Sequence, residues 1–348
     1  MTPLEFRLVN DFQRAFPLER RPFARIARDC RADARDVIAA FRALRARGAI
    51  GRIGAVFRPN TVGASMLAAI EVPERDLERV AALVSRRDSV NHNYARDHAV
   101  NLWFVATASD AAALEAEIVA IEADTGLPVL RCPLVEPYHI DLGFDLSRQL
   151  AQRPHERRRA AANGVRADTG EGGPPHARPA AAAALDEADR RLMQAIEHGL
   201  PLAPRPYDRL AARAGLTVPE VQARMRRWQA DGIVHRFGVI VRHAALGYVA
   251  NAMAVWDVPQ ARVREIGQAL AAEPRVTLCY QRARSLPRWR FNLYCMVHGH
   301  DRAEVADTLV ALVRRHDLQA LPHAVLFRRH EYKQTGARYR RVQADGHA

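Results

Sequence analysis

Cysteine and lysine are scarce in this chain of 348 residues, and long apolar runs are missing. The four cysteines are scattered and form no C-x-x-C pair. This argues against an iron–sulfur cluster or a structural zinc site, because both need several ligands at set spacings. No apolar stretch approaches the roughly 18 residues that a membrane-spanning helix requires. The amino-terminal segment MTPLEFRLVNDF lacks the basic-then-apolar pattern of a secretory signal. We therefore expect a cytoplasmic protein with reduced thiols, no membrane segment and no metal site of its own.

The charge balance is strongly positive. Lysine and arginine total 52 against 39 acidic residues, a formal net charge of +13, and nearly all of the cations are arginines. Such an excess favours a polyanionic partner, either nucleic acid or a ligand with many carboxylates. The planar guanidinium fork matches carboxylate and phosphate equally well. Charge alone therefore leaves both partners open.

The sequence contains one pattern twice, on either side of residues 146–184. This central stretch is rich in arginine, proline, glycine and alanine and lacks apolar periodicity, so we interpret it as a linker. GRIGAVFRPNTVG at 51–63 matches HRFGVIVRHAALG at 235–247 at an offset of 184, and later matches need offsets of 186 and then 191. A chain that matches itself through short insertions is a duplication. The later matches include Val72 with Val258, Tyr94 with Tyr280, Asn101 with Asn292, and His139 with His330.

Each copy begins with three short predicted helices and an apolar ribbon, which is typical of a winged helix-turn-helix. The order βαββαβ follows, which is typical of a ferredoxin-like half. We predict an α+β fold of tandem winged helix-turn-helix and ferredoxin-like modules that form an intramolecular pseudo-dimer. The predicted winged helices are 1–58 and 185–242, and the predicted ferredoxin-like halves are 59–145 and 243–340, with the linker between the copies.

Two strings in the second modules carry a more specific signal. VNHNYARDHAVNLWFV at 90–105 resembles the H-N-Y-x-R-x-H-x-x-N-L-W-F signature of one siroheme decarboxylase subunit type. VTLCYQRARSLPRWRFNLYCMVHG at 276–299 resembles the C-Y-x-R and M-x-H-G signature of the partner type. The module order resembles the Lrp/AsnC family over both halves. The chain is thus similar to a siroheme decarboxylase, here with both subunit types fused.

This resemblance implies a carboxy-lyase of haem biosynthesis. Its substrate is siroheme, and it removes CO2 from the C12 and C18 acetate groups to give didecarboxysiroheme. The fused form resembles the denitrification branch, which leads to the dioxo-haem of nitrite reductase. The tetrapyrrole ring accepts the electrons of the broken bond, so we expect no cofactor beyond the iron that siroheme carries.

Side-chain alternation along the strands identifies candidate site residues. His92, Tyr94, Arg96 and, if the strand continues, His98 fall on one strand face, and Leu278, Tyr280, Arg282 and Arg284 share the equivalent face of the second copy. Buried polar groups of this kind require a partner, which a charged ligand supplies. Decarboxylation needs a proton at carbon, so His92 and Tyr94 are the catalytic candidates, with the choice between them open. Because His92 corresponds to Leu278, we expect one working pocket rather than two equal ones. The predicted substrate-binding residues are Arg96, His98, Trp103, Tyr280, Arg282, Arg284, Trp289 and His298.

The alternative interpretation is an Lrp/AsnC-type DNA-binding regulator. The third predicted helix of each copy is rich in arginine, as recognition helices often are. Such regulators bind near-palindromic sites with two identical DNA-binding domains, whereas the two predicted winged helices of this chain share few residues outside the core. We therefore expect DNA to be an unlikely partner, no membrane partner, and a possible homodimer; a siroheme-binding protein without catalysis is a further alternative. The arginines in question are Arg35, Arg42, Arg45, Arg47, Arg224, Arg226 and Arg227.

Overall fold

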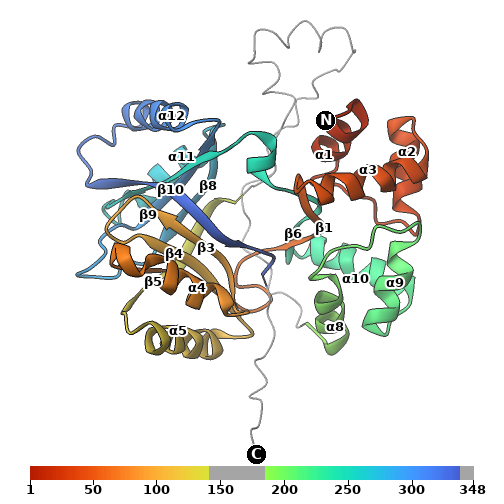
Figure 1. Cartoon of the computed structure of the whole chain (residues 1–348), viewed down its shortest axis with the longest axis horizontal. Helices are drawn as coiled ribbons and strands as arrows, with labels where there is room; N and C mark the ends of the chain where they lie inside the picture. Colours follow the sequence, from red (N-terminus) through yellow and green to blue (C-terminus); the bar gives the residue numbers. More distant parts are fainter. Residues whose placement is uncertain (141–184, 338–348) are drawn as a thin grey trace, which may run out of the picture. The chain divides into compact units, whose positions relative to one another are not determined.

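The computed structural model describes residues 1–140 and 185–337 (Figure 1). The predicted linker 146–184 lies outside the described residues. The chain divides into two compact units, and each takes one segment from either copy. The first unit comprises Met1–Val56 with the described part of Gly143–Arg242, and the second comprises the rest. No helix in the described ranges is long and apolar enough to cross a membrane.

The first unit contains both winged helices. In the first copy, Thr2 opens a helix with a capping box; in the second, Thr217 and Glu220 form the capping box that the sequence predicts. The ribbons of the two copies pair with each other in one two-stranded sheet. The elements of the first copy are α1 (Pro3–Asp11), α2 (Pro22–Cys30), α3 (Ala34–Ala46) and β1 (Ile50–Phe57). Those of the second are α8 (Glu187–Ile196), α9 (Pro206–Ala214), α10 (Val218–Ala230) and β6 (Val234–Val241).

The third helices of the two winged domains are each fixed to the opposite domain. Arg42 on α3 donates a hydrogen bond from Nη2 to the carbonyl of Leu202 at 2.9 Å. Arg226 on α10 donates from Nη2 to the carbonyl of Leu18 at 3.2 Å. Both members of one pair lie 184 residues from their counterparts in the other, so this docking follows the duplication. The helices that contact DNA in a winged-helix regulator thus take part in packing between the domains here.

The second unit is a closed barrel of eight strands in the order β10-β3-β4-β2-β5-β8-β9-β7. Helices pack on its outer face, over two separate apolar cores. The first half contains β2 (Ala64–Ile70), the 3₁₀ turn η1 (Glu74–Asp76), α4 (Leu77–Arg86), β3 (Val90–Arg96), β4 (Leu102–Ala108), α5 (Ala111–Thr125) and β5 (Val129–Ile140). The second contains η2 (His243–Leu246), β7 (Ala250–Trp256), α11 (Val263–Ala271), β8 (Val276–Arg282), β9 (Leu293–Gly299), α12 (Arg302–Arg315) and β10 (His323–Gln334).

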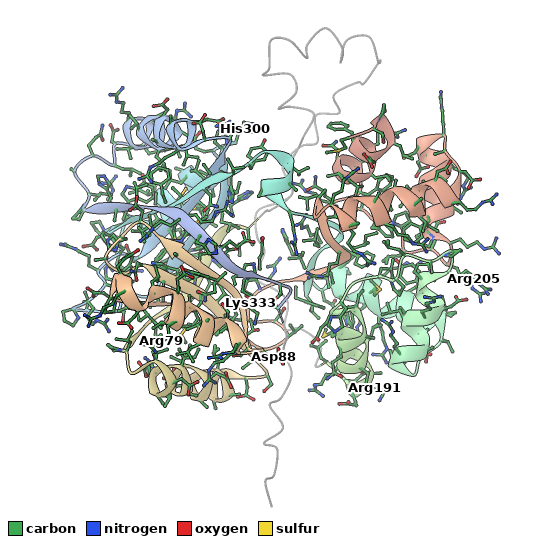
Figure 2. All side chains as sticks on the ribbon, in the orientation of Figure 1. Arg79, Asp88, Arg191, Arg205, His300 and Lys333 are labelled. Carbon is green, nitrogen blue, oxygen red and sulfur yellow. The ribbon has the colours of Figure 1, made fainter. Side chains whose placement is uncertain are left out.

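Two long strands join the halves. Strand β5 pairs with β2 of its own half and then with β8, while β10 pairs with β7 and then with β3. Tyr138 at the end of β5 enters the apolar core of the second half, and Tyr332 on β10 packs against the core of the first. Lys333, labelled in Figure 2, donates hydrogen bonds from Nζ to two carbonyls of the first half. The predicted pseudo-dimer is confirmed, and the last strand of each half extends from its own sheet onto that of the other half.

Matching hydrogen bonds support the duplication. The side chain of Asn101 bonds both backbone groups of Val72, at 3.0 and 2.8 Å, and Asn292 bonds those of Val258 at 2.8 and 3.0 Å. One predicted match is wrong. His139 pairs with Cys279 and His330 with Ala95, so these two histidines do not occupy equivalent places. The connection before β10 is longer than the one before β5. The offset between equivalent residues of these two strands is therefore three residues larger than the predicted 191.

Candidate active site

Strand β3 divides its side chains between the helix layer and the barrel interior. Asn93 faces outwards, because its amide donates to the Ala81 carbonyl at 3.1 Å and to Ser85 Oγ at 3.0 Å on α4. Strand alternation then directs His92, Tyr94 and Arg96 into the interior. The equivalent strand β8 directs Leu278, Tyr280 and Arg282 there, and Leu278 and Tyr280 are partly buried and pack against the apolar cluster inside the barrel. The structure thus brings the two predicted strand faces together.

Arg96 and Arg282 occupy equivalent positions. Arg96 donates from Nη1 to the Leu326 carbonyl at 2.9 Å, and Arg282 donates from Nη1 to the Cys132 carbonyl at 2.8 Å. Each Nε is buried without a hydrogen-bond partner. Burial lowers the pKa of Arg96 to about 10. Within the described ranges, neither guanidinium has a carboxylate partner, although buried charges in proteins are usually paired.

Two tyrosines accompany these arginines. The guanidinium carbon of Arg282 lies 4.6 Å from the centre of the Tyr280 ring, and that of Arg96 lies 5.9 Å from the centre of the Tyr94 ring. Burial is the largest cause that raises the pKa of both phenols. Tyr94 and Tyr280 therefore keep their protons at neutral pH.

Two histidines lie at one end of the interior. The ring of His92 is centred 6.1 Å from that of Tyr94, and its Nδ1 lies 2.5 Å from Oδ1 of Asn91. An amide oxygen only accepts hydrogen bonds, so this contact is a hydrogen bond when Nδ1 of His92 carries the hydrogen. His298 on β9 places Nδ1 2.9 Å from Oγ1 of Thr277. Because β9 runs antiparallel to β8, the end of β9 lies beside the start of β8, level with His92 on the equivalent strand.

Tryptophan closes the opposite end of the interior. Trp103 and Trp289 are 1% and 2% exposed, and their rings are centred 5.1 Å apart. The indole nitrogens donate to the carbonyl of Val100 at 2.8 Å and to the hydroxyl of Tyr294 at 2.7 Å. His92 and Tyr94 are only partly buried. The interior is thus apolar and sealed at the tryptophan end and polar and more exposed at the histidine end.

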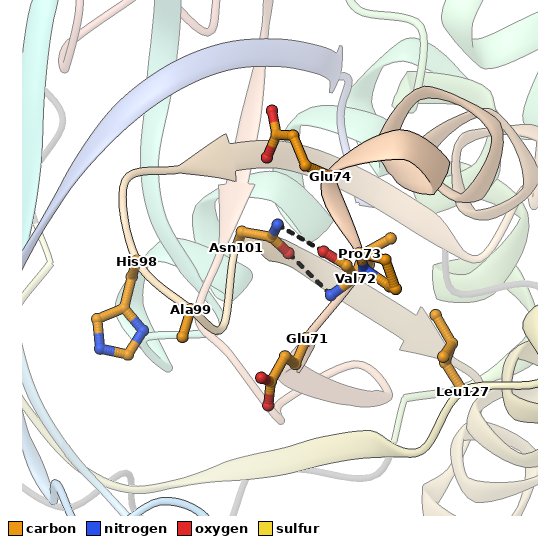
Figure 3. A pocket seen from close by; sticks show the side chains of 8 residues that line it. All are labelled: Glu71, Val72, Pro73, Glu74, His98, Ala99, Asn101 and Leu127. Carbon is orange, nitrogen blue, oxygen red and sulfur yellow. Dashed lines mark hydrogen bonds between the residues drawn. The ribbon is translucent and has the colours of Figure 1, made fainter.

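His98 and Arg284 do not continue the inward faces of Arg96 and Arg282. The prediction that Arg284 shares this face is wrong, and the condition set for His98, a strand that continues past Arg96, is not met. Both follow the last residue of their strands, so alternation no longer applies to them. His98 lines an open groove of about 490 Å³ together with Glu71 (Figure 3). In the equivalent place of the second half, Arg284 donates to Oδ1 of Asp257 from Nε at 3.0 Å and from Nη2 at 2.6 Å.

Polar residues of β10 also line the interior, and the sequence did not predict them. Arg328 pairs with Arg96 and Glu331 pairs with Tyr94 across the two strands, and directly opposite residues share a face. Two register shifts interrupt this pairing, so simple alternation along β10 does not reveal which residues face inwards. Among the described residues, no group of three or more metal-ligating side chains lies together.

The fold and this interior define a duplicated protein of the Lrp/AsnC type with two fused, chemically unequal halves. Family models agree: residues 62–133 and 245–333 match an AsnC-like ligand binding domain, and residues 5–50 and 189–234 match a siroheme decarboxylase NirDL-like HTH domain.

Curated relatives match nearly the full length of the chain. It is 46% identical to the siroheme decarboxylase NirDL subunit of Paracoccus pantotrophus over 338 residues, which are 97% of both chains. It is 44% identical to the NirDL subunit of Paracoccus denitrificans, over 99% of both chains. A crystal structure of the siroheme decarboxylase NirDL has the same fold, with a TM-score of 0.66 at 23% identity over 98% of this chain and 94% of that one. The chain belongs to the siroheme decarboxylase NirDL family.

Proposed function

We propose that this protein is a siroheme decarboxylase and that the substrate binds in the barrel interior. The observation that carries the proposal is the pair of buried arginines without carboxylate partners, Arg96 and Arg282. Siroheme is a flat apolar ring with carboxylates at its rim. A bound substrate of this kind supplies the missing anions, and the apolar side chains of the interior contact its ring.

The arginines are assigned to positioning rather than to the chemical step. A guanidinium clamped on the carboxylate that leaves as CO2 stabilises the ground state more than the transition state, which slows the reaction. Arg96 and Arg282 are therefore assigned to carboxylates that are kept. Because these contacts hold the ring, the reacting acetate is oriented before any bond breaks.

The chemical step breaks the bond between the acetate methylene and its carboxylate. The bonding electrons enter the tetrapyrrole ring, CO2 leaves, and a proton is added to the methylene carbon to give a methyl group. His92 is the better donor, because histidine titrates near neutral pH. Tyr94, whose pKa burial raises, is assigned to hydrogen bonding rather than to proton transfer. Two such steps, at the C12 and C18 acetates, give didecarboxysiroheme without a further cofactor.

The activity is tested by anaerobic incubation of the purified protein with siroheme, followed by the mass of the tetrapyrrole. The expected product is lighter by two CO2 units. An unchanged mass contradicts the proposal, and binding of siroheme without a change in mass indicates the non-catalytic alternative. We place this reaction in the cytoplasm, on the route to the dioxo-haem of nitrite reductase.

We further propose that the winged helices are a scaffold and not a DNA-binding device. Arg42 and Arg226 are used between the two domains. On α10, Arg224 and Arg227 each donate a hydrogen bond to the buried carboxylate of Asp189. Fluorescence anisotropy with a random-sequence duplex and with the protein's own promoter should show only weak, salt-sensitive binding. Tight binding that depends on sequence contradicts the scaffold role.

A further inference from the structure

The barrel interior has two walls related by the pseudo-twofold axis, and they differ in polarity. Both walls carry an arginine and a tyrosine, Arg96 with Tyr94 and Arg282 with Tyr280. At the positions where the walls differ, the first, formed by β3, β10, β7 and β9, is polar, and the second, formed by β8, β5, β2 and β4, is apolar or carries smaller polar groups. The strand registers define the equivalent positions. The pairs that differ are His92 with Leu278, Arg328 with Leu134, Glu331 with Pro137, Gln334 with Ile140, Asn251 with Ser65, and His298 with Thr107.

Arg328 is the cation at the centre of the polar wall. On one side it pairs with Arg96 of β3. On the other, Phe327 pairs with Ala252, which places Arg328 beside Asn251 of β7. Its side chain is 17% exposed, so the guanidinium is largely shielded from solvent.

The hydrogen bonds of Arg328 hold it in place and leave capacity for a ligand. Nη1 donates to Oε2 of Glu331 at 3.1 Å, and Nη2 donates to the Val249 carbonyl at 2.8 Å. A guanidinium has five N–H donors, and these two bonds fix the plane of the fork while further donors remain. Glu331 in turn pairs across the strands with Tyr94, so the ion pair adjoins the proposed catalytic residues.

We propose that Arg328, oriented by Glu331, binds a carboxylate of the substrate that is not removed, and so turns the reacting edge of the macrocycle towards the polar wall. This inference rests on the proposed function and adds a residue that determines the orientation of the substrate. An approximately symmetric interior with Arg96 and Arg282 on opposite strands allows the ring to bind in two orientations. A third arginine on one wall alone favours one of them, and that orientation presents an acetate to His92.

The test moves the cation from one wall to the other. Arg328→Leu copies the residue of the second wall, and the double variant Arg328→Leu with Leu134→Arg restores the charge on the wrong side. Optical titration with siroheme under anaerobic conditions gives the dissociation constant, and the masses of products during turnover give the ratio of mono- to didecarboxylated tetrapyrrole. Leu134→Met is the matched control, and Glu331→Gln is a milder variant in which both residues of the pair keep their size.

Arg328→Leu should weaken siroheme binding about tenfold, as expected for one charge-assisted hydrogen bond, and should let the monodecarboxylated product accumulate. The double variant should recover part of the binding but not the turnover, since the ring then faces the apolar wall. Glu331→Gln should raise KM with a smaller change in kcat, and Leu134→Met should match the wild type.

Wild-type affinity and product ratio in Arg328→Leu overturn the inference, as does a double variant that regains full turnover. If Arg328→Leu does not fold, unchanged KM and product ratio in Glu331→Gln overturn it instead. If the wild type itself forms no product, the proposed function fails, whereas the titration still shows whether Arg328 binds the tetrapyrrole.

Discussion

Replacing Arg96 with methionine is expected to stabilise the substrate-free protein and to weaken its binding of siroheme. Arg96 is 5% exposed, and burial lowers its pKa from 12.5 to about 10. The folded protein releases this proton near pH 10, whereas the unfolded chain holds it to a higher pH. The charged form is therefore destabilised in the fold by about 3 kcal/mol at neutral pH.

Methionine also removes favourable contacts of Arg96, the hydrogen bond to the Leu326 carbonyl and the contact with Met296 Sδ at 3.9 Å. The loss of these contacts costs about 1–2 kcal/mol and so offsets part of the stability gained by removing the buried charge. The net gain of about 1–2 kcal/mol should raise the Tm of the substrate-free protein by a few degrees. In the complex the variant lacks a charge-assisted bond worth about 1.5–3 kcal/mol, so its Kd for siroheme should rise about 10- to 150-fold.

Thermal unfolding with and without siroheme, together with an anaerobic optical titration, measures both effects. Arg131→Met is the matched control, because Arg131 forms an ion pair with Glu122 on the outside of the barrel; it should lower the Tm slightly and leave the Kd unchanged. A lower Tm and an unchanged Kd for Arg96→Met refute the reasoning, since they assign Arg96 to folding and not to the substrate.

Three further predictions concern the site and the duplication. His92→Ala should reduce kcat far more than it weakens siroheme binding, because a proton donor acts mainly in the transition state, while Leu278→Met should have little effect in the same steady-state assay. Siroheme affinity should fall as the pH rises through about 10, where Arg96 loses its proton; titrations across this range should show no such step in Arg96→Met. Asn101→Ala and Asn292→Ala should each lower the free energy of unfolding in urea by about 2–3 kcal/mol, since each leaves two buried backbone groups without partners, and a loss in only one of them contradicts their equivalence.

The sequence predicts the fold because its signals are local and repeated. Capping at Thr217, helical apolar spacing and strand alternation all act within a few residues of chain, and the second copy confirms the reading of the first. The alternation that places His92, Tyr94 and Arg96 on one face depends only on the geometry of β3. The interior that these residues share with β8 follows from the pseudo-dimer.

The remaining features depend on contacts between distant segments. The end of a strand is set by its neighbours, so the sequence left open whether the strand that contains Arg96 continues to His98; β3 ends at Arg96. The register of β10 depends on the length of the preceding connection and on two bulges, so His330 was matched with the wrong residue. For the same reason Arg328 and Glu331 were not recognised as neighbours of Tyr94.

The central claim is that the protein removes two carboxylates from siroheme and replaces each with a proton. The most direct test is an anaerobic incubation in D2O, with the mass of the tetrapyrrole measured by spectrometry. We predict a product that has lost two CO2 units and carries one solvent deuterium in each new methyl group, formed by the wild type and not by His92→Ala. A tetrapyrrole that returns with its carboxylates intact, or one that loses CO2 equally fast with the His92→Ala variant, contradicts the account.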